Sequence, residues 1–461
     1  MPPAFFPVLA LFALGSPVAP MDSSAVARVL ALLRAADTTV CELAAQTVSN
    51  SWGLRWDVDL LPTPMPMPMP TPMPMPMMRH QNGRAPRVHV HVRHGGAWWT
   101  VDSAAVGAFR AVLRDESRCV RNLAARVLGR ARARGSYDAF LALLGDARPG
   151  LRETGALGLS ELGERRALRP LQGALRDRNP GVRAMAAHGL GVIDDSSSIG
   201  PLANALTDEV EHVRQVAAWA LGQIDAQAVI EPLGRALRDR SSEVRSMAAW
   251  ALGARGSTRV LAALGNAVKD STYTVRRAAA WALGQAGGED AVDLLLPLLG
   301  DPDATVRTAA AHALGQIASR RAVRGLAPLV HDTSPEVRRA AVWGLGESGD
   351  PSAVGALGTS LKDPDPDIRQ LSAWALGQIG DTHAVDALAP GLKDHEPQVR
   401  VAAAWALGQI GSTHAREPLE AAVHDASPEV QEAVQWALDQ LDGEGRPRSR
   451  ARPRVRVRSP I

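Results

Sequence analysis

A single sequence unit recurs every 31 residues along three quarters of the chain. In its clearest copy an Asp, Asp394, stands five residues before Val399-Arg400, and the unit closes with Ala-Ala-Trp-Ala-Leu-Gly at Gly408. We call the Val position the anchor; it falls at Val120, Leu151, Val182, Val213, Val244, Val275, Val306, Val337, Ile368, Val399 and Val430. The Asp recurs at Asp115, Asp146, Asp177, Asp208, Asp239, Asp270, Asp301, Asp332, Asp363, Asp394 and Asp425. A fixed period of this size indicates a solenoid.

Each unit carries the apolar spacing of two helices. Before the anchor Val399, spacings of three and four form one stripe at Val385, Leu388 and Leu392. From the anchor onward, a second stripe runs through Ala403, Ala406 and Leu407. Residues three and four apart lie on one face of an α-helix. The unit is therefore predicted to be an antiparallel helix pair, whose members we call the first and the second helix.

Turn residues mark the ends of the second helix. Ser334-Pro335-Glu336 stands directly before an anchor, as an N-cap, a first-turn proline and a first-turn acid. Gly380 and Gly411 follow second helices and suit a left-handed C-terminal stop. Both ends of the second helix are thus predicted from local sequence.

The period divides the chain into five segments. An apolar leader covers residues 1–20, and an N-terminal capping helix pair covers 21–50, where Val40 takes the anchor position and Cys41 replaces the Arg. An insertion covers 51–102, eleven repeats cover 103–442, and a basic tail covers 443–461. The expected fold is all-α: a right-handed α-solenoid of about 12 stacked antiparallel helix pairs, with one short β-hairpin in the insertion.

The second-helix sequence Val-Arg-x-x-Ala-Ala-x-Ala-Leu-Gly at Val399–Gly408 resembles the short HEAT-like repeats named after phycobilisome lyases. The resemblance covers about residues 103–442. It implies that Asp394, Arg400 and their equivalents are structural and link the loops of successive units into a ladder. Likeness of the repeat alone says little about activity.

The N-terminal segment leaves the compartment open. Met1–Pro20 is apolar, with Phe5–Leu14 in the place of a signal-peptide core and Ala13-Leu14-Gly15 as a candidate cleavage site. No Lys or Arg precedes Arg28, however, and Pro7 interrupts the run. Export and a cytoplasmic location are equally compatible with this pattern. No apolar run reaches the roughly 20 residues that a membrane-spanning helix needs.

The insertion is unlike the repeats. Pro62–Met78 alternates Pro with Met, which excludes helix and sheet and predicts polyproline II or disorder. Val88–Val92 alternates Val and His, and with Ala97–Val101 it predicts the hairpin. Cu(I) prefers thioether and imidazole ligands, so one interpretation is a metal site with candidates at Met73, Met75, Met77, His80, His89 and His91. The other interpretation is an ordinary linker followed by an exposed hairpin.

The two cysteines, Cys41 and Cys119, stand at the starts of second helices in neighbouring units. Stacked helices lie ~8–10 Å apart, whereas a disulfide needs Cα atoms within about 7 Å. We therefore expect two free thiols.

A column of aromatic residues stands six places after the anchors. It comprises Trp219, Trp250, Trp281, Trp343, Trp374, Trp405 and Trp436, with His188 and His312 in the same register. This position lies about 240° round the helix from the anchor, so we expect the column to face outward. A second column stands ten places after the anchors, at Gln223, Gln285, Gln316, Gln378, Gln409 and Gln440. Second helices line the concave surface of such solenoids, so this surface is predicted to carry both columns.

Two roles are open for the Trp column. A row of partly exposed Trp is costly in a monomer, and Trp is the residue type most enriched at binding hot spots. Alternatively, each indole lies flat against the neighbouring second helix and closes the stack, with a Gln accepting its N–H. We favour binding, and the experiments below test it.

Enzyme chemistry finds no matching motif. Iron-dependent deoxyhypusine hydroxylases also resemble this repeat, but their His-Glu metal ligands follow directly after Val-Arg, where this chain has no His. The single His-Glu dipeptide, His395-Glu396, falls in a predicted turn. No His-Glu-x-x-His is present for a zinc protease. We expect no enzymatic activity and no cofactor.

Charge argues against a nucleic-acid groove. The chain carries a net charge of +3, of which seven Arg between Arg446 and Arg458 supply +7, so the remainder carries −4. HEAT-like DNA glycosylases hold DNA in a basic groove, and such a groove needs a continuous positive stripe. The tail alternates Arg with Pro or Val and predicts a disordered arm. The predicted function is a monomeric, non-enzymatic scaffold that binds a protein or peptide on its concave Trp and Gln face.

Overall fold

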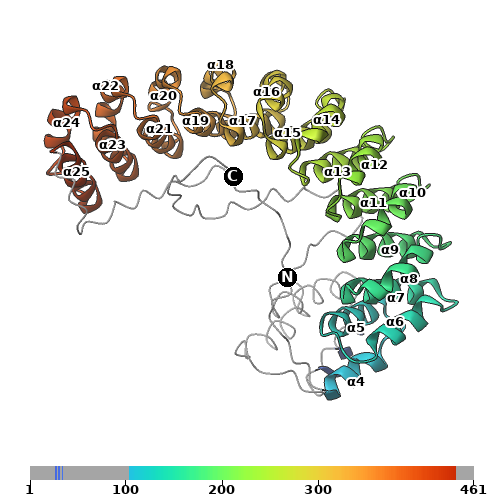
Figure 1. The fold of residues 1–461 in the computed structure, drawn as a ribbon. Helices are drawn as coiled ribbons and strands as arrows, with labels where there is room; N and C mark the ends of the chain where they lie inside the picture. The colour runs from blue at the N-terminus through green and yellow to red at the C-terminus, as the bar shows by residue number, and fades with distance from the viewer. Residues whose placement is uncertain (1–25, 28–29, 32–33, 35–102, 443–461) are drawn as a thin grey trace. The chain divides into compact units, whose positions relative to one another are not determined.

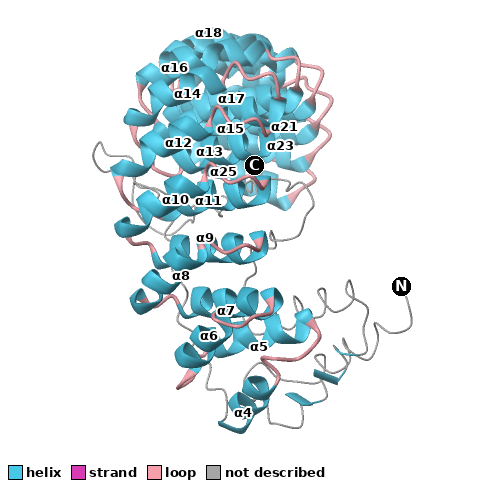
Figure 2. Ribbon diagram, turned by 90° about the vertical axis from the view of Figure 1, so that its right-hand side faces the viewer, coloured by secondary structure: helices cyan, strands magenta, loops and turns pink. Residues whose placement is uncertain are grey.

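A computed structural model describes residues 103–442, together with positions 26, 27, 30, 31 and 34. Every regular element in these residues is a helix, and none is a strand (Figure 2). The predicted hairpin, the copper candidates Met73 to His91, the leader and the tail lie outside the described residues. The all-helical repeat architecture is confirmed for residues 103–442.

The chain divides into two compact units, and within the described residues the division falls between Ala251 and Leu252. Each helix pair consists of a first helix with an even label and a longer second helix with an odd label (Figure 1). Unit 1 holds α4 (Ser103–Ala111), α5 (Arg118–Arg130), α6 (Ser136–Leu144), α7 (Pro149–Leu162), α8 (Leu168–Ala174), α9 (Pro180–Ile193), α10 (Ile199–Ala205), α11 (Glu211–Gln223) and α12 (Ile230–Ala236). The division lies within α13 (Ser242–Gly253). Unit 2 holds α14 (Leu261–Ala267), α15 (Tyr273–Ala286), α16 (Glu289–Leu295), α17 (Ala304–Ile317), α18 (Val323–Leu326), α19 (Pro335–Glu347), α20 (Val354–Ser360), α21 (Pro366–Ile379), α22 (Val385–Leu388), α23 (Pro397–Ile410), α24 (Arg416–Glu420) and α25 (Pro428–Leu441).

Prolines shorten several first helices. Pro297, Pro328 and Pro390 stand in the 3-10 segments Leu296–Gly300, Ala327–His331 and Ala389–Lys393, which complete the first helices of their pairs. Proline has no N–H to donate, and its ring clashes with the preceding turn of an α-helix. Each proline stands in the first two positions of its 3-10 segment, where its missing N–H leaves no helical hydrogen bond unmade. The predicted apolar stripe stays buried, as Leu392 shows.

Second helices pack on one another in chain order. Within unit 1 the contacts run from α5 through α7 and α9 to α11, and within unit 2 from α15 to α25. In each unit the second helices form one row and the first helices the other (Figure 1). Every anchor is buried, none with more than 3% of its surface exposed. The anchor stripe therefore fills the core between the two rows, as the sequence predicts.

The predicted caps are confirmed. Ser334 Oγ accepts a hydrogen bond from the Val337 N–H at 3.4 Å, and Pro335 opens α19. Gly380 and Gly411 end α21 and α23 with φ of 72° and 67°. Glycine carries no Cβ penalty in this left-handed region. Each second helix of this kind is therefore delimited by its own sequence.

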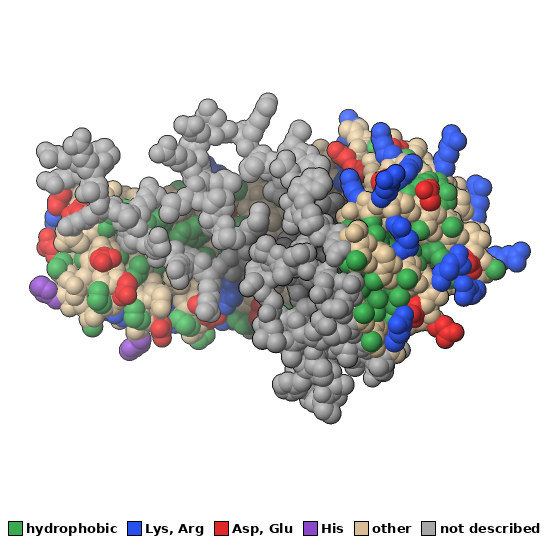
Figure 3. All heavy atoms as spheres, turned by 90° about the horizontal axis from the view of Figure 1, so that it is seen from below, with side chains coloured by type: hydrophobic (Ala, Val, Ile, Leu, Met, Phe, Trp, Pro, Cys, Tyr) green, Lys and Arg blue, Asp and Glu red, His purple; other side chains and the backbone are tan. Residues whose placement is uncertain are grey.

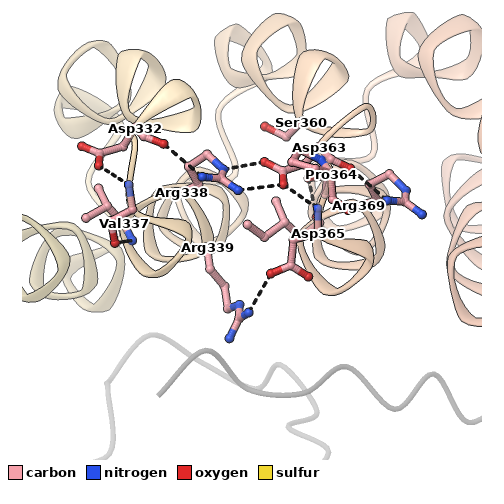
Figure 4. Close-up of polar contacts among 12 residues, drawn as sticks. Asp332, Val337, Arg338, Arg339, Ser360, Asp363, Pro364, Asp365 and Arg369 are labelled. Atoms are coloured by element: carbon pink, nitrogen blue, oxygen red, sulfur yellow. Dashed lines mark hydrogen bonds and ion pairs between the residues drawn. The ribbon is translucent and has the colours of Figure 1, made fainter. Parts of the chain in front are cut away.

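An Arg and Asp ladder joins successive pairs, as the resemblance implies (Figure 4). Arg338 Nε and Nη2 donate to the two carboxylate oxygens of Asp363 in the next pair, at 2.6 and 3.0 Å. Arg338 Nη1 also donates to the Asp332 carbonyl oxygen of its own pair, at 3.1 Å. The same bidentate contact joins Arg152 to Asp177, Arg183 to Asp208, Arg214 to Asp239, Arg276 to Asp301, Arg307 to Asp332, Arg369 to Asp394 and Arg400 to Asp425.

The ladder changes in the first and last described repeats. Arg114, not Arg121, contacts Asp146, at 2.7 Å. At the other end, Gln431 takes the Arg position and donates to the Asp425 carbonyl oxygen at 2.6 Å. Gln431 retains the contact within its own pair and carries no charge that would need an Asp in a following repeat. The ladder of the described repeats therefore ends at Asp425.

The ladder predicts acid sensitivity. Hydrogen bonds from Arg152 and from Arg400 hold the pKa values of Asp177 and Asp425 below the ordinary value of about 3.9. A carboxylate whose pKa is lowered by folding stabilises the protein above its unfolded pKa, and that contribution is lost as the pH falls through the folded pKa. The free energy of unfolding in urea should therefore hold between pH 7 and about pH 5 and fall below about pH 4. The Asp425→Asn variant should lose less over the acid range, whereas equal stability of the wild type at pH 3 and pH 5 would contradict the ladder's role.

The expectation of a free thiol at Cys119 is wrong, because Cys119 is disulfide-bonded. Its partner lies outside the described residues. The separation of helix axes overstates the distance between facing residues, since each Cα lies ~2.3 Å from its own helix axis. Facing positions on stacked helices can therefore meet the disulfide geometry that the axes alone suggest is out of reach.

The N-terminal capping unit is described at a few positions only. Val26 and Leu30 are helical and buried. Arg34 forms an ion pair with Asp115 at 2.7 Å, which is the Asp of the first repeat. Asp115 therefore receives an Arg from the segment that precedes its repeat, as the other ladder carboxylates do.

Candidate interaction surface

The Trp column lies on the second helices, but it is more enclosed than the helical-wheel argument predicts. Trp405 and Trp436 are buried, with 7% and 9% of their surface exposed, and His312 is buried at 7%. The other indoles are half-buried: Trp219, Trp250, Trp281, Trp343 and Trp374. The expectation that the column faces outward is thus wrong for Trp405, Trp436 and His312, whereas the half-buried indoles keep part of their surface exposed.

A glycine of the preceding pair accommodates the indole. A Cβ atom built on Gly377 would lie 2.7 Å from Cζ3 of Trp405, and one built on Gly315 would lie 2.4 Å from Cζ3 of Trp343. Contacts this short leave no room for any side chain at the glycine. The last residue of Ala-Leu-Gly therefore forms a seat on which the six-membered ring of the next indole rests. The repeating Gly, 28 residues before each Trp, is the signal from which this contact could have been found.

Column members of neighbouring pairs also meet ring to ring. In unit 1 the His188 and Trp219 rings stack with centroids 4.8 Å apart and planes inclined by 4°. In unit 2 the His312 and Trp343 centroids lie 5.5 Å apart with a 50° tilt. Aromatic contacts of this kind add to the energy of burial. The column therefore helps to close the stack while leaving part of several rings accessible.

The Gln column is the exposed part of this surface. Gln316, Gln378, Gln409 and Gln440 are exposed, and Gln223 and Gln285 are half-buried. Gln285 Nε2 donates to Gln316 Oε1 at 3.2 Å, so two rungs are linked side chain to side chain. A primary amide offers both donors and an acceptor. A row of exposed amides at a fixed period can hydrogen-bond a ligand that itself presents regularly spaced N–H and C=O groups.

One carboxylate interrupts the Gln column in unit 2. Glu347 stands ten places after its anchor, between Gln316 and Gln378, and its side chain reaches solvent. Desolvation by the surrounding protein nevertheless raises the pKa of Glu347, and no basic group offsets this effect. Nearer the other end of the second helices, Arg339 contacts Asp365 of the next pair at 3.0 Å (Figure 4). The second-helix row thus carries charged groups as well as amides and indoles.

The described residues offer neither a metal cluster nor a membrane-spanning helix. No group of three or more His, Cys, Asp or Glu side chains in those residues is placed to hold a metal ion. None of the described helices combines the length and apolar character needed to cross a bilayer. The copper candidates His80, His89 and His91 stay predictions, since they lie outside the described residues.

The sequence matches the family described as HEAT repeats in eight overlapping segments that together cover residues 106–451. No curated protein matches the chain. Three similar solved structures are 15% identical to it: "Kap95p Binding Induces the Switch Loops of RanGDP", "Kap95:Nup1 complex", and importin beta in an ammonium sulfate condition. They cover 73%, 74% and 76% of this chain and 56%, 57% and 53% of their own, with TM-scores of 0.52, 0.52 and 0.47.

The chain thus spans little more than half the length of these solenoids, and at 15% identity the likeness concerns the fold alone. The family match does not depend on these solved structures. It covers the same residues that carry the 31-residue period and the helix pairs. The chain therefore belongs to the HEAT-repeat family.

Proposed function

We propose that this protein is a non-enzymatic interaction scaffold that binds a protein or peptide on the second-helix face, as a monomer and without a cofactor. The observation that carries the proposal is the exposed Gln column beside half-buried indoles on the same helices. An extended segment of a partner would find backbone hydrogen-bonding groups in the amides and apolar contact in the rings. Trp is enriched where such contacts dominate binding energy.

The fold relatives support the class of partner. The printed titles of two of them describe Kap95p with RanGDP and Kap95 with Nup1, which are complexes of a solenoid of this fold with other proteins. We extend this to the present chain as a proposal that its partner is a protein. A HEAT-repeat enzyme or enzyme subunit is the alternative, and it predicts turnover of a substrate in place of stoichiometric binding.

The charge distribution supports a protein partner over a nucleic acid. Residues 181–442, which carry the Trp column, hold 22 Lys and Arg against 33 Asp and Glu. The largest excess of positive charge in the repeats lies in residues 103–180, with 15 Arg against eight acids. Figure 3 shows basic side chains spread over unit 1. A nucleic-acid groove would need its positive stripe along the Trp and Gln columns themselves.

Capture from the native source tests the proposal. The test variant replaces the exposed Gln316, Gln378 and Gln409 by Ala, and the control variant replaces the exposed Asn204, Asn266 and Thr359 of the first-helix row by Ala. We expect one protein retained by the wild type and the control variant and lost from the Gln variant. Equal retention by all three, or retention only of nuclease-sensitive material, would contradict binding of a protein on this face.

A further inference from the structure

The second-helix face of α19, α21, α23 and α25 presents an open polar column at the C-terminal end of the repeats. Its members are Glu347, Gln378, Gln409 and Gln440, and all four side chains are exposed. They belong to the last residues of their helices. No described segment therefore covers this column, although Trp374 and Trp405 beneath it are partly or fully enclosed.

The repeats that carry this face are strongly acidic. Residues 335–442 hold 17 Asp and Glu against seven Lys and Arg, whereas residues 252–334 of the same unit hold seven against nine. Ladder carboxylates such as Asp394 are already bound by Arg. Glu347 is the exposed carboxylate of the column itself, whereas the exposed Glu396 and Glu432 lie at the opposite, N-terminal ends of α23 and α25. Figure 3 shows acidic side chains on this end of unit 2.

The segment that follows α25 has the complementary charge. Between Arg446 and Arg458 every second residue is Arg, and no acid interrupts the series. In an extended chain alternate side chains point to the same side, ~6.6–6.8 Å apart. Seven guanidinium groups would then line one edge of the segment. Each could bind a carboxylate or a Gln carbonyl oxygen.

The length and starting point of the tail also fit this face. α25 ends at Leu441, directly after Gln440, so the tail leaves the repeats at the column itself. The 16 residues from 443 to 458 span about 50 Å when extended. Four stacked helices at ~8–10 Å spacing place Glu347 about 30 Å from Gln440. The Arg series is thus long enough to reach the far end of the column.

We propose that residues 443–461 dock in extended form across the C-terminal ends of the second helices of α19–α25, with the Arg side chains against Glu347 and the amide oxygens of Gln378, Gln409 and Gln440. The tail then occupies the C-terminal half of the surface assigned above to a partner, and a partner must displace it. Docking of the tail is intramolecular and needs no partner. A failed test of tail docking would therefore leave the proposed function intact, and a failed test of the proposed function would leave tail docking intact.

Zero-length cross-linking in the full chain tests the proposal. The seven tail Arg are changed to Lys, which keeps their charge and supplies amines that a carbodiimide joins to carboxylates within contact distance. We expect cross-links from the tail to Glu347 to exceed those to Asp386, Glu417 and Glu420 of the first-helix row by about tenfold, as electrostatic focusing allows. They should be independent of protein concentration and weaken several-fold between ~0.05 M and ~0.5 M salt.

Two variants with matched charge changes complete the design. E347Q should abolish the dominant cross-links, whereas D386N, at an exposed position of the first-helix row, should leave them unchanged. Because these side chains are exposed, neither change should alter the fold, and circular dichroism verifies this. Three results would each overturn the proposal: cross-links spread evenly over both rows, cross-links formed only between copies of the chain, or no cross-links at low salt.

Discussion

Replacement of Trp405 by Ala should lower the free energy of unfolding by about 3–5 kcal/mol. The indole is buried at 7% exposure, and its six-membered ring rests on Gly377 of the preceding pair. Removing it deletes the transfer free energy of a large apolar group and leaves a cavity at a junction between two pairs. That junction has no other large side chain at the seat to collapse into the space. Urea titration followed by circular dichroism measures the loss.

Trp374 and Gln409 provide the controls for this prediction. Trp374 is half-buried, and a Cβ atom on its seat, Gly346, would lie 3.5 Å from Cζ3, so the indole is less tightly held. Trp374→Ala should therefore cost clearly less than Trp405→Ala, while Gln409→Ala, at an exposed position, should cost no more than about 0.5 kcal/mol. Equal losses at Trp405 and Gln409 would show that the indole does not close the stack.

Gly315→Ala should be strongly destabilising, by about 3 kcal/mol, at the upper end of the range for overpacked cores. The added Cβ would lie 2.4 Å from Cζ3 of Trp343 and 2.8 Å from the Cα of Gly344. The ring already contacts His312, and the backbone of α19 cannot withdraw without opening the contact between the pairs. The clash should thus separate two second helices that otherwise pack closely.

A second glycine and a double mutant make this prediction specific. Gly355 is an exposed helical residue with nothing within 4 Å of an added Cβ, so Gly355→Ala should stabilise the protein by about 0.4–1 kcal/mol. Combined with Trp343→Ala, Gly315→Ala should cost at least about 1 kcal/mol less than the sum of the two single losses, because the ring no longer meets the methyl group. If the losses in unfolding free energy of the two single variants were additive, the Trp343 ring would not rest on Gly315.

Most of the fold follows from local sequence. The anchors at 31-residue spacing, the Ser334 cap and the Gly380 stop each act within one helix pair, so a single repeat is enough to predict them. The ladder from Arg338 to Asp363 joins two pairs and was implied by the resemblance, since both residues recur at fixed offsets. The 3-10 segments at Pro297, Pro328 and Pro390 were not foreseen, although proline in a first helix is a local signal for them.

The environment of the Trp column could not be predicted in the same way. A helical wheel gives the direction of a side chain relative to its own helix, and Trp405 does point away from its anchor. Whether that direction meets solvent depends on how closely the preceding second helix approaches. That approach is set by Gly377, a residue 28 places earlier in another repeat. The Gln column is different because Gln378 and Gln409 stand beyond the seats, where the stack leaves them open.

We propose that a protein partner is held by the exposed columns of the second helices. Calorimetric titration of the captured partner against the Gln316, Gln378 and Gln409 triple-Ala variant tests it most directly, with the Asn204, Asn266 and Thr359 variant in parallel. Three lost hydrogen bonds at about 0.5–1.5 kcal/mol each should weaken binding by about 2 kcal/mol or more, roughly 30-fold, while the unfolding free energy stays within about 0.5 kcal/mol. Unchanged affinity of the Gln variant, with affinity lost in the first-helix variant, would place the partner on the opposite face and contradict the account.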